Sequence, residues 1–328
     1  MNNPIRWGVI GAAGIAHKMF LPAAAAASNA SVRALASRSM GKAQEMADKF
    51  DIPKVYEGYD ALLADPDIDA VYIPLPNKLH VEATLSALAA RKHVLCEKPI
   101  SMKAEEVAKI ADAATEAQCH AMEGFMVAYH PQWEHVRSWI ASGAIGDIKH
   151  IEGCFTYFLD DAENIRNHAD GGALRDVGVY PIFATRLITG KEPKRVLGRM
   201  VFDDTAAADV NTSAWMEFDG FDANFHVNTR ADKSHSIIVY GTHGRIEMPT
   251  CFNPADVGAQ SVYLFKGDQI SETKTFTDVF QFALQVENVS DVFAGNATAV
   301  VSLENSAANQ RVVDAIIRSA ETNGWVDV

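Results

Sequence analysis

The sequence lacks several features that would place it outside the ordinary globular proteins. Its four cysteines lie far apart, at positions 96, 119, 154 and 251, and no Cys-x-x-Cys occurs. This spacing favours reduced thiols and a cytoplasmic protein. No uncharged apolar run of about 20 residues is present, and the apolar start at 7–16 is broken by glycines, so we expect neither a membrane helix nor a signal peptide. Neither His-Glu-x-x-His nor Gly-x-Ser-x-Gly occurs, which argues against a metal site and a serine-hydrolase site.

Basic residues are scarce relative to acidic ones. The chain has 29 Lys and Arg against 42 Asp and Glu, a formal net charge of −13. Proteins that bind a phosphate backbone usually present a basic surface, so we expect no nucleic-acid partner. Hydrophobic residues make up 48% of the chain, which excludes intrinsic disorder. At roughly 150 residues per domain, 328 residues predict two domains.

The first third of the chain alternates strand and helix patterns. Short β-rich runs at 5–10, 32–36, 70–73 and 93–96 are followed by helical patterns, at 15–28, at 41–50, after Asn77 and after Ser101. Such alternation is typical of a parallel sheet covered on both faces. We therefore expect a doubly wound α/β (Rossmann) domain over residues 1–122.

The pattern changes in the second part of the chain. Residues 221–229 alternate between apolar and polar, which is typical of an antiparallel strand, and Asp219-Gly220 before them indicates a hairpin turn. We expect an α+β domain over residues 123–328 with a large, mostly antiparallel open sheet. A last helix, at about 302–320, is expected to pack back near the first domain.

The first strand leads into a glycine turn that suits a dinucleotide. In Gly11-Ala12-Ala13-Gly14-Ile15-Ala16, the backbone can approach a pyrophosphate at a helix N-terminus. The match is weak by itself, because alanines replace the second and third glycines of G-x-G-x-x-G. Its position at the first strand–helix junction strengthens it. The simpler alternative is a tight turn in another kind of α/β protein.

The end of the second strand bears on the choice of dinucleotide. Folds that prefer NAD place Asp or Glu there, whereas this chain has Ser37-Arg38-Ser39, with Lys42 shortly after. A hydroxyl and a guanidinium can hold a 2′-phosphate that a carboxylate would repel. We therefore predict NADP over NAD. The alternative is that Arg38 is only a solvated cation at a helix start.

Three motifs together resemble a known family. They are Pro74-Leu75-Pro76-Asn77 with His80, then Glu97-Lys98-Pro99, then the run from Gly171 to Tyr180. In this order they resemble the glucose-fructose oxidoreductase/inositol dehydrogenase (Gfo/Idh/MocA) family. With Asn164-Ile165-Arg166, they are most similar to its dimeric dihydrodiol dehydrogenases and NADP-dependent D-xylose dehydrogenases. One departure is that Asp170 stands where a third glycine is expected.

Hydride transfer at an alcohol carbon needs a proton donor or acceptor and stabilisation of charge on the oxygen. Lys98 offers a cation, and Tyr180 offers a proton if a nearby cation lowers its pKa. Asp176 lies four residues before Tyr180, on the same face of a helix that we expect to begin close to Pro181. Each also has a simpler explanation: an exposed loop cation for Lys98, a core aromatic for Tyr180, and a helix cap for Asp176.

The resemblance implies the same roles, with Lys98 and Tyr180 in proton transfer and Asp176 orienting them. Arg166 either binds substrate or forms a surface ion pair. The resemblance adds further residues to the cofactor site, beyond the glycine turn, Ser37, Arg38, Lys42 and Lys98: Pro74, Leu75, Asn77, His80, Glu97 and Glu123. No metal site is expected.

The leading hypothesis is an NADP-dependent dehydrogenase or reductase acting on a sugar, polyol or related cyclic alcohol. One alternative is a glycoside hydrolase that oxidises its sugar transiently with bound NAD. Another is a non-catalytic dinucleotide sensor. The open sheet leaves a broad face to cover, and the resemblance implies that a second subunit packs there, so we expect a homodimer or a higher homo-oligomer.

Overall fold

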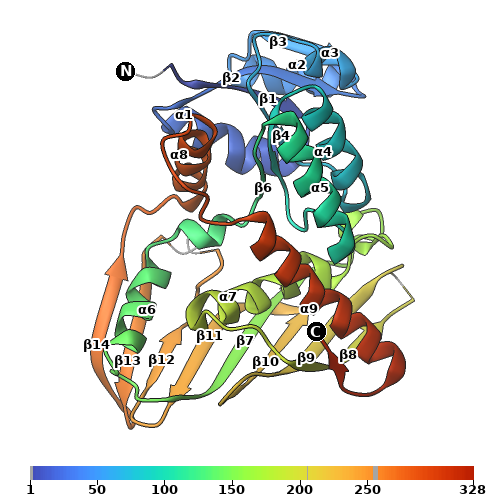
Figure 1. The fold of residues 1–328 in the computed structure, drawn as a ribbon. Coiled ribbons are helices and arrows are strands. Elements are labelled where there is room, and N and C mark those ends of the chain that lie inside the picture. The colour runs from blue at the N-terminus through green and yellow to red at the C-terminus, as the bar shows by residue number, and fades with distance from the viewer. Residues whose placement is uncertain (1–2, 205, 254–257) are drawn as a thin grey trace. The chain divides into compact units, whose positions relative to one another are not determined.

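The computed structural model describes residues 3–204, 206–253 and 258–328, and the chain forms two compact units (Figure 1). The first unit comprises residues 1–129 and 280–307, and the second comprises residues 130–279 and 308–328. The expected boundary at residue 122 differs from this division mainly because residues 280–307 belong to the first unit. The described helices include none that is both long and apolar enough to cross a membrane.

The first unit contains a six-stranded parallel sheet in the order β3-β2-β1-β4-β5-β6. Its strands are β1 (Ile5–Ile10), β2 (Ala30–Ser37), β3 (Lys54–Glu57), β4 (Ala70–Ile73), β5 (His93–Cys96) and β6 (Ala121–Glu123). The doubly wound α/β class is therefore confirmed. Because all the strands are parallel, their carboxyl ends share one edge of the sheet, where ligands bind in folds of this kind.

Helices cover both faces of the parallel sheet. They are α1 (Leu21–Ala26), α2 (Met40–Lys49), α3 (Asp60–Leu63), α4 (His80–Ala89), α5 (Ala104–Ala117) and α8 (Gln281–Phe293). Helices α4 and α5 pack side by side, while α8 packs against α1 (Figure 1). Trp7 of β1 is fully buried beside Phe293 of α8, and its Nε1 donates to Ser290 Oγ at 3.1 Å. Helix α8, although it comes late in the sequence, thus contributes to the hydrophobic core of the first unit.

Two helices open with wide turns that the sequence did not predict. Residues Ala16–Phe20 and Leu174–Gly178 are π-helical, and each leads into an α-helix, α1 or α7 (Val179–Thr189). Both wide turns come shortly before a proline, Pro22 or Pro181. Proline has no N–H to donate and clashes with the carbonyl one turn earlier, and a wide turn relieves this conflict. The helix expected to begin close to Pro181 therefore begins before it.

The helix after Ser101 also begins differently from the prediction. A helix that began directly after Ser101 would have this serine as its N-cap, but α5 starts at Ala104 with Lys103 at the N-cap position. The carboxylate of Glu106 accepts from the backbone N–H groups of Met102 and Lys103, both at 3.1 Å. A side chain within the first turn therefore satisfies donors that precede the helix.

The second unit contains a nine-stranded sheet in the order β14-β13-β12-β11-β7-β10-β9-β8-β15. Its strands are β7 (Ile148–Phe158), β8 (Arg195–Phe202), β9 (Asp209–Glu217), β10 (Asp222–Asn228), β11 (Arg230–Gly241), β12 (Arg245–Met248), β13 (Gln260–Lys266), β14 (Gln269–Phe276) and β15 (Val326–Asp327). The hairpin at Asp219-Gly220 joins β9 to β10 as predicted. All neighbouring strands are antiparallel except β10 and β7, which are parallel, so the sheet is mostly antiparallel as expected.

Helices α6 (Gln132–Ala141), α7 and the later part of α9 (Leu303–Thr322) pack on one face of this sheet (Figure 1). Helix α9 belongs to both units. Leu303 and Ala307 pack against the core of the first unit, whereas Ser319 Oγ accepts from the N–H of Gly198 in β8. On the other face of the sheet, Trp215 remains 46% exposed.

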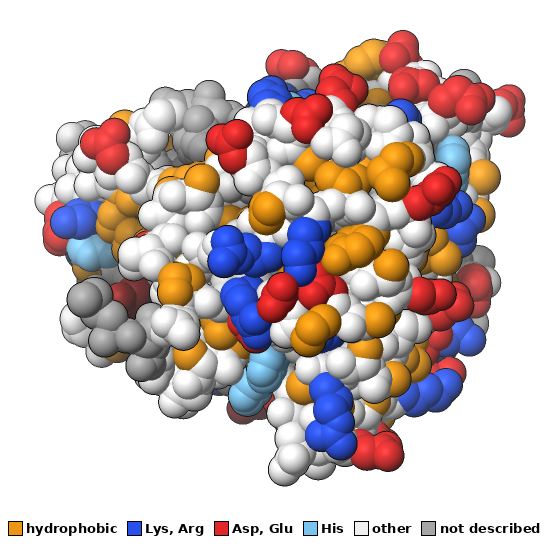
Figure 2. Space-filling view, turned by 90° about the horizontal axis from the view of Figure 1, so that it is seen from above, with side chains coloured by type: hydrophobic (Ala, Val, Ile, Leu, Met, Phe, Trp, Pro, Cys, Tyr) orange, Lys and Arg blue, Asp and Glu red, His pale blue; other side chains and the backbone are white. Residues whose placement is uncertain are grey.

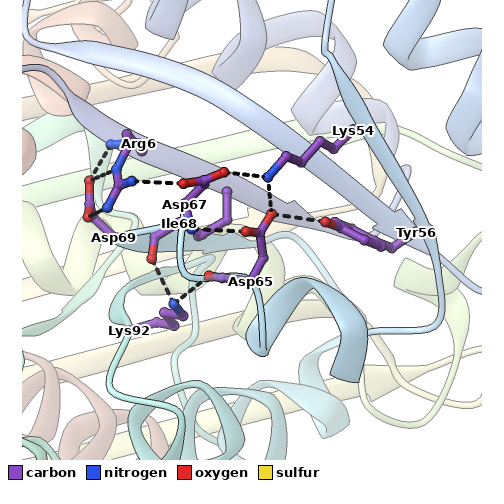
Figure 3. A network of polar contacts seen from close by, with 8 residues as sticks. All are labelled: Arg6, Lys54, Tyr56, Asp65, Asp67, Ile68, Asp69 and Lys92. Atoms are coloured by element: carbon purple, nitrogen blue, oxygen red, sulfur yellow. Dashed lines mark hydrogen bonds and ion pairs between the residues drawn. The ribbon is translucent and has the colours of Figure 1, made fainter.

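A network of hydrogen bonds and ion pairs connects residues at the amino ends of the parallel strands (Figure 3). Lys54 at the start of β3 donates to Asp65 Oδ2 at 2.8 Å, and Arg6 at the start of β1 pairs with Asp69 Oδ1 at 2.6 Å. The buried Lys92 donates to the carbonyls of Asp65 and Ile68. The hydrogen bond from Lys54 lowers the pKa of Asp65 to about 2. This network lies at the edge opposite the carboxyl ends and therefore stabilises the sheet away from the ligand edge.

Candidate active site

The glycine turn after β1 has room for a ligand where the sequence predicts one. Gly11 has φ +114°, and a Cβ there would lie 2.9 Å from Leu75 Cδ2, so no larger residue fits without strain. A Cβ at Gly14 would meet no atom within 4 Å. The turn is therefore tight beneath Gly11 and open at Gly14. This open space beside backbone N–H groups fits the pyrophosphate of a dinucleotide.

The side chains at the end of β2 also suit a phosphorylated ribose. Ser37 is buried, and its Oγ accepts from the N–H of Ser39 at 3.2 Å. Arg38 and Lys42 are exposed. A carboxylate that would repel a 2′-phosphate is absent at position 38, immediately after the strand.

Two loops at the same edge are joined by the buried His80. Its Nδ1 lies 2.7 Å from the carbonyl oxygen of Pro99, and its Nε2 lies 2.7 Å from that of Leu75. The loop after β4 is thereby tied to the loop after β5. The hydroxyl of Tyr72 donates to Glu97 Oε1 at 2.6 Å and fixes the latter loop further.

Glu123, at the end of β6, forms a hydrogen bond with Ile100 in the loop after β5. Its Oε1 accepts from the N–H of Ile100 at 2.8 Å. Burial raises the pKa of Glu123 to about 7, against the opposing effects of Ser306 and Lys98. Lys98 therefore lies in a loop that is held on both sides of it. The adjacent residues Glu97, Pro99 and Ile100 each contact a buried polar side chain.

In the second unit, Asp176 is held by two donors. Tyr157 Oη donates to Asp176 Oδ2 at 2.6 Å, and Arg166 Nε donates to the same oxygen at 3.0 Å. The Asp176 side chain is 13% exposed and that of Arg166 is 47% exposed. The structure thus brings the predicted Arg166 and Asp176 together as an ion pair, open to solvent on the arginine side.

Tyr180 lies in α7, a few residues after Asp176. Its ring packs against Phe155 and Phe252, with centroids 5.5 and 5.6 Å apart, and the residue is 5% exposed. Its charge when ionised would interact with Arg166, which places the phenol and the guanidinium in one electrostatic environment. The ring is therefore part of the core, and Tyr180 lies near enough to Arg166 for their charges to interact.

The two glycines before Ala173 permit close packing at the start of the Asp176 helix. A Cβ at Gly171 would collide with the carbonyl of Arg166, and a Cβ at Gly172, where φ is +97°, would collide with Asp209 Oδ1. Asp209 Oδ2 accepts from the N–H of Leu174 at 2.9 Å. The glycines thus let the Arg166 loop and Asp209 approach the helix start.

Sequence reasoning missed three of these side chains. Tyr157, Asp209 and Tyr72 occur in no motif that we singled out. The alternation along β7 could have placed Tyr157 on the same face as Phe155, but it does not reveal a hydrogen-bond partner. Within the described residues, no group of His, Cys, Asp and Glu could hold a metal ion.

Comparison with known proteins defines the class and then the family. Residues 5–125 match the model described as "Oxidoreductase family, NAD-binding Rossmann fold", and residues 133–247 match the "GFO/IDH/MocA C-terminal domain". The chain is therefore an oxidoreductase with a Rossmann domain. It belongs to the Gfo/Idh/MocA family, which confirms the resemblance and the expectation of an NAD(P)-dependent enzyme.

Three relatives cover much or nearly all of the chain. A D-xylose 1-dehydrogenase (NADP(+)) from Haloferax volcanii is 35% identical over 98% of this chain and 99% of its own length. A trans-1,2-dihydrobenzene-1,2-diol dehydrogenase from Xenopus laevis is 32% identical over 67% of each chain. A 3-ketoreductase from Actinomadura kijaniata, solved with NADP and TDP-benzene, is 33% identical, with a TM-score of 0.91 over 97% of this chain and 98% of that one. The branch of the family that the motifs indicated is thereby confirmed.

Proposed function

We propose that this protein transfers a hydride between NADP(H) and an alcohol or carbonyl carbon of a sugar, polyol or related cyclic alcohol. The main support is the ligand edge of the parallel sheet. There the open glycine turn, Arg38 and the fixed loop of Lys98 follow the carboxyl ends of β1, β2 and β5, which belong to the same parallel sheet. The activities and cofactors named for the relatives support the same class of reaction.

The residues of the first unit would hold the cofactor in distinct ways. The turn from Gly11 to Ile15 would bind the pyrophosphate, and Ser37, Arg38 and Lys42 would bind the 2′-phosphate. The loops after β4, β5 and β6 would flank the nicotinamide. When bound, the nicotinamide accepts or donates the hydride.

Lys98, Tyr180 and Asp176 would carry the proton chemistry. A phenol with a pKa of about 10 is a poor base near neutrality, so it needs a nearby cation that favours its ionised form. Arg166 is one such cation within the second unit, and we propose that Lys98 is another. Asp176, held by Tyr157 and Arg166, would orient the reacting hydroxyl. Lys98, Arg166, Asp176 and Tyr180 would together bind the substrate.

A coupled screen tests this function. Purified protein is mixed with NADP and, one at a time, free and phosphorylated aldoses, inositols, dihydrodiols and TDP-sugars, while the absorbance of reduced nicotinamide is followed. The proposal predicts stoichiometric reduction with at least one compound class and weaker activity with NAD. Release of sugar from an added glycoside, without net reduction, would instead indicate a hydrolase with transient oxidation, and NADP binding without any turnover would indicate a sensor.

A further inference from the structure

Strand β7 contacts both helical residues proposed for the chemistry. Phe155 and Tyr157 lie two residues apart and so point to the same face of the strand, about 6.7 Å apart along it. Asp176 and Tyr180 lie about one helical turn apart, a comparable length. Phe155 therefore packs on the Tyr180 ring while Tyr157 bonds to the Asp176 carboxylate.

Tyr157 is a permanent hydrogen-bond donor. Burial, and then the charge of Asp176, raise the pKa of Tyr157 above the usual range, whereas Arg166 and Arg230 act in the opposite direction. Its hydroxyl therefore keeps its proton throughout the range in which enzymes of this kind operate. This property makes Tyr157 unsuitable as a proton shuttle and suitable as a fixed support for a carboxylate.

Two donors bond to the same oxygen of Asp176, and together they restrain the direction in which its carboxylate points. Tyr157 and Arg166 both donate to Oδ2 of Asp176, from strand β7 and from the loop before the wide turn, respectively. The side chain of Arg166 is 47% exposed, whereas Tyr157 is only partly exposed, so the arginine is restrained less than the phenol. A short bond from a rigid ring on a central strand fixes the carboxylate more strongly than a flexible arginine can.

We propose that Tyr157 is a positioning residue for the reaction, and that its hydroxyl fixes the orientation of the Asp176 carboxylate. This inference rests on the proposed function for its kinetic consequences, but not for the orientation itself. Tyr157 acts through Asp176 and takes no part in moving a proton.

The variant Tyr157→Phe tests the proposal, because it removes the hydroxyl and keeps the ring. We expect kcat to fall by about 10- to 100-fold, as for loss of a hydrogen bond to a charged group, with KM and the Kd for NADP within about twofold of wild type. The charged or titratable groups that act on Tyr157 or Arg166, the two donors to this carboxylate, include Asp176 itself, Tyr180 and Arg230. Removing one donor makes the carboxylate easier to protonate, so the acidic limb of the pH profile should move to higher pH.

Tyr240→Phe is the matched control. Tyr240 also donates to a carboxylate, Glu152 Oε2 at 3.4 Å, in the same sheet. We expect its kinetics to match wild type. Equal kinetics for Tyr157→Phe and wild type would overturn the proposal. So would a loss confined to NADP affinity or to the melting temperature, because that would indicate a purely structural role.

Crystal structures of wild type and Tyr157→Phe separate this inference from the proposed function. If wild type shows no turnover with any substrate class, the proposed function fails, while the Asp176 carboxylate can still be examined. We expect that carboxylate to rotate or to adopt two orientations in Tyr157→Phe. A single orientation identical to that of wild type would overturn the inference.

Discussion

Arg38, immediately after β2, is the side chain on which cofactor preference should depend most. We expect Arg38→Asp to raise the Kd for NADP by about 100-fold and to change the Kd for NAD much less, because the substitution replaces a bidentate phosphate partner with a repelling charge. Fluorescence titration with both dinucleotides measures this. The matched control is Arg33→Asp, at an exposed position of the same strand. Equal losses in the two variants would show that Arg38 acts only through net charge.

At the residue scale, Glu123 should make a pH-dependent contribution to the stability of the folded protein. Burial raises its pKa from 4.5 to about 7 in the folded protein, so the folded state binds more protons than the unfolded state between these values. The contribution of Glu123 to stability therefore falls as the pH rises from 4.5 to 7. We expect Glu123→Gln to be more stable relative to wild type above pH 7 than near pH 4.5.

Urea unfolding of the two proteins at both pH values checks this, with the exposed Glu82→Gln as the control. A stability difference between Glu123→Gln and wild type that does not change with pH would contradict the assigned cause, as would one that changes in the opposite direction.

The residues of the candidate site were predictable to different degrees. Lys98, Asp176 and Tyr180 stand in motifs that have a recognisable order, so the sequence identifies them as candidates. Tyr157 and the two hydrogen bonds of His80 depend on which strand and which loop lie opposite, and no local pattern contains that information. For the same reason, the sequence left open whether Arg166 forms an ion pair, and the structure identifies Asp176 as its partner.

At the scale of elements, the start of the Asp176 helix should be sensitive to side chains at Gly172. We expect Gly172→Ala to lower the free energy of unfolding by about 1–3 kcal/mol more than Gly190→Ala does. Both glycines have positive φ, but only at Gly172 would a Cβ collide with Asp209, whereas at Gly190 it meets no atom within 4 Å. Chemical denaturation measures both losses. Equal losses of unfolding free energy in the two variants would show that Asp209 moves aside without a free-energy cost.

Element prediction succeeded where the hydrophobic period was clear and failed where tertiary contacts decide. Strands β1, β4 and β5 have the predicted bounds. Strand β3 was not predicted, because none of its residues is fully buried, whereas β4 and β5, of the same length, are almost wholly buried. The wide turns before Pro22 and Pro181 were not predicted either, since a proline signals a conflict with the helix but not how the chain resolves it.

At the scale of the whole molecule, we propose that the nine-stranded sheet pairs with a second copy. Trp215 is 46% exposed on the face away from the helices, and an aromatic side chain of this size is typical of an interface. We expect light scattering to give at least twice the monomer mass of 35.7 kDa. Trp215→Glu should shift the protein toward the monomer. A wild-type mass near that of one chain would contradict the proposal.

The two-unit organisation was predictable only in outline. The change of pattern near residue 123 indicates two domains, and the sheet types in both are as expected. The return of residues 280–307 to the first unit was not predicted, because the apolar face of α8 does not specify which sheet it covers. Likewise, the alternation in β10 predicts a half-buried strand, but it does not show that one of its neighbours, β7, is parallel.

Replacement of Lys98 by methionine is the most direct test of the proposed chemistry, with NADP-linked turnover measured on the best substrate of the screen. The matched control is Lys109→Met, which removes an exposed cation from α5 of the same unit. If Lys98 supplies the proton or the cation, Lys98→Met should lose several orders of magnitude in kcat while it binds NADP as wild type does, and Lys109→Met should be unaffected. Full activity of Lys98→Met would contradict the assignment of Lys98 to proton transfer.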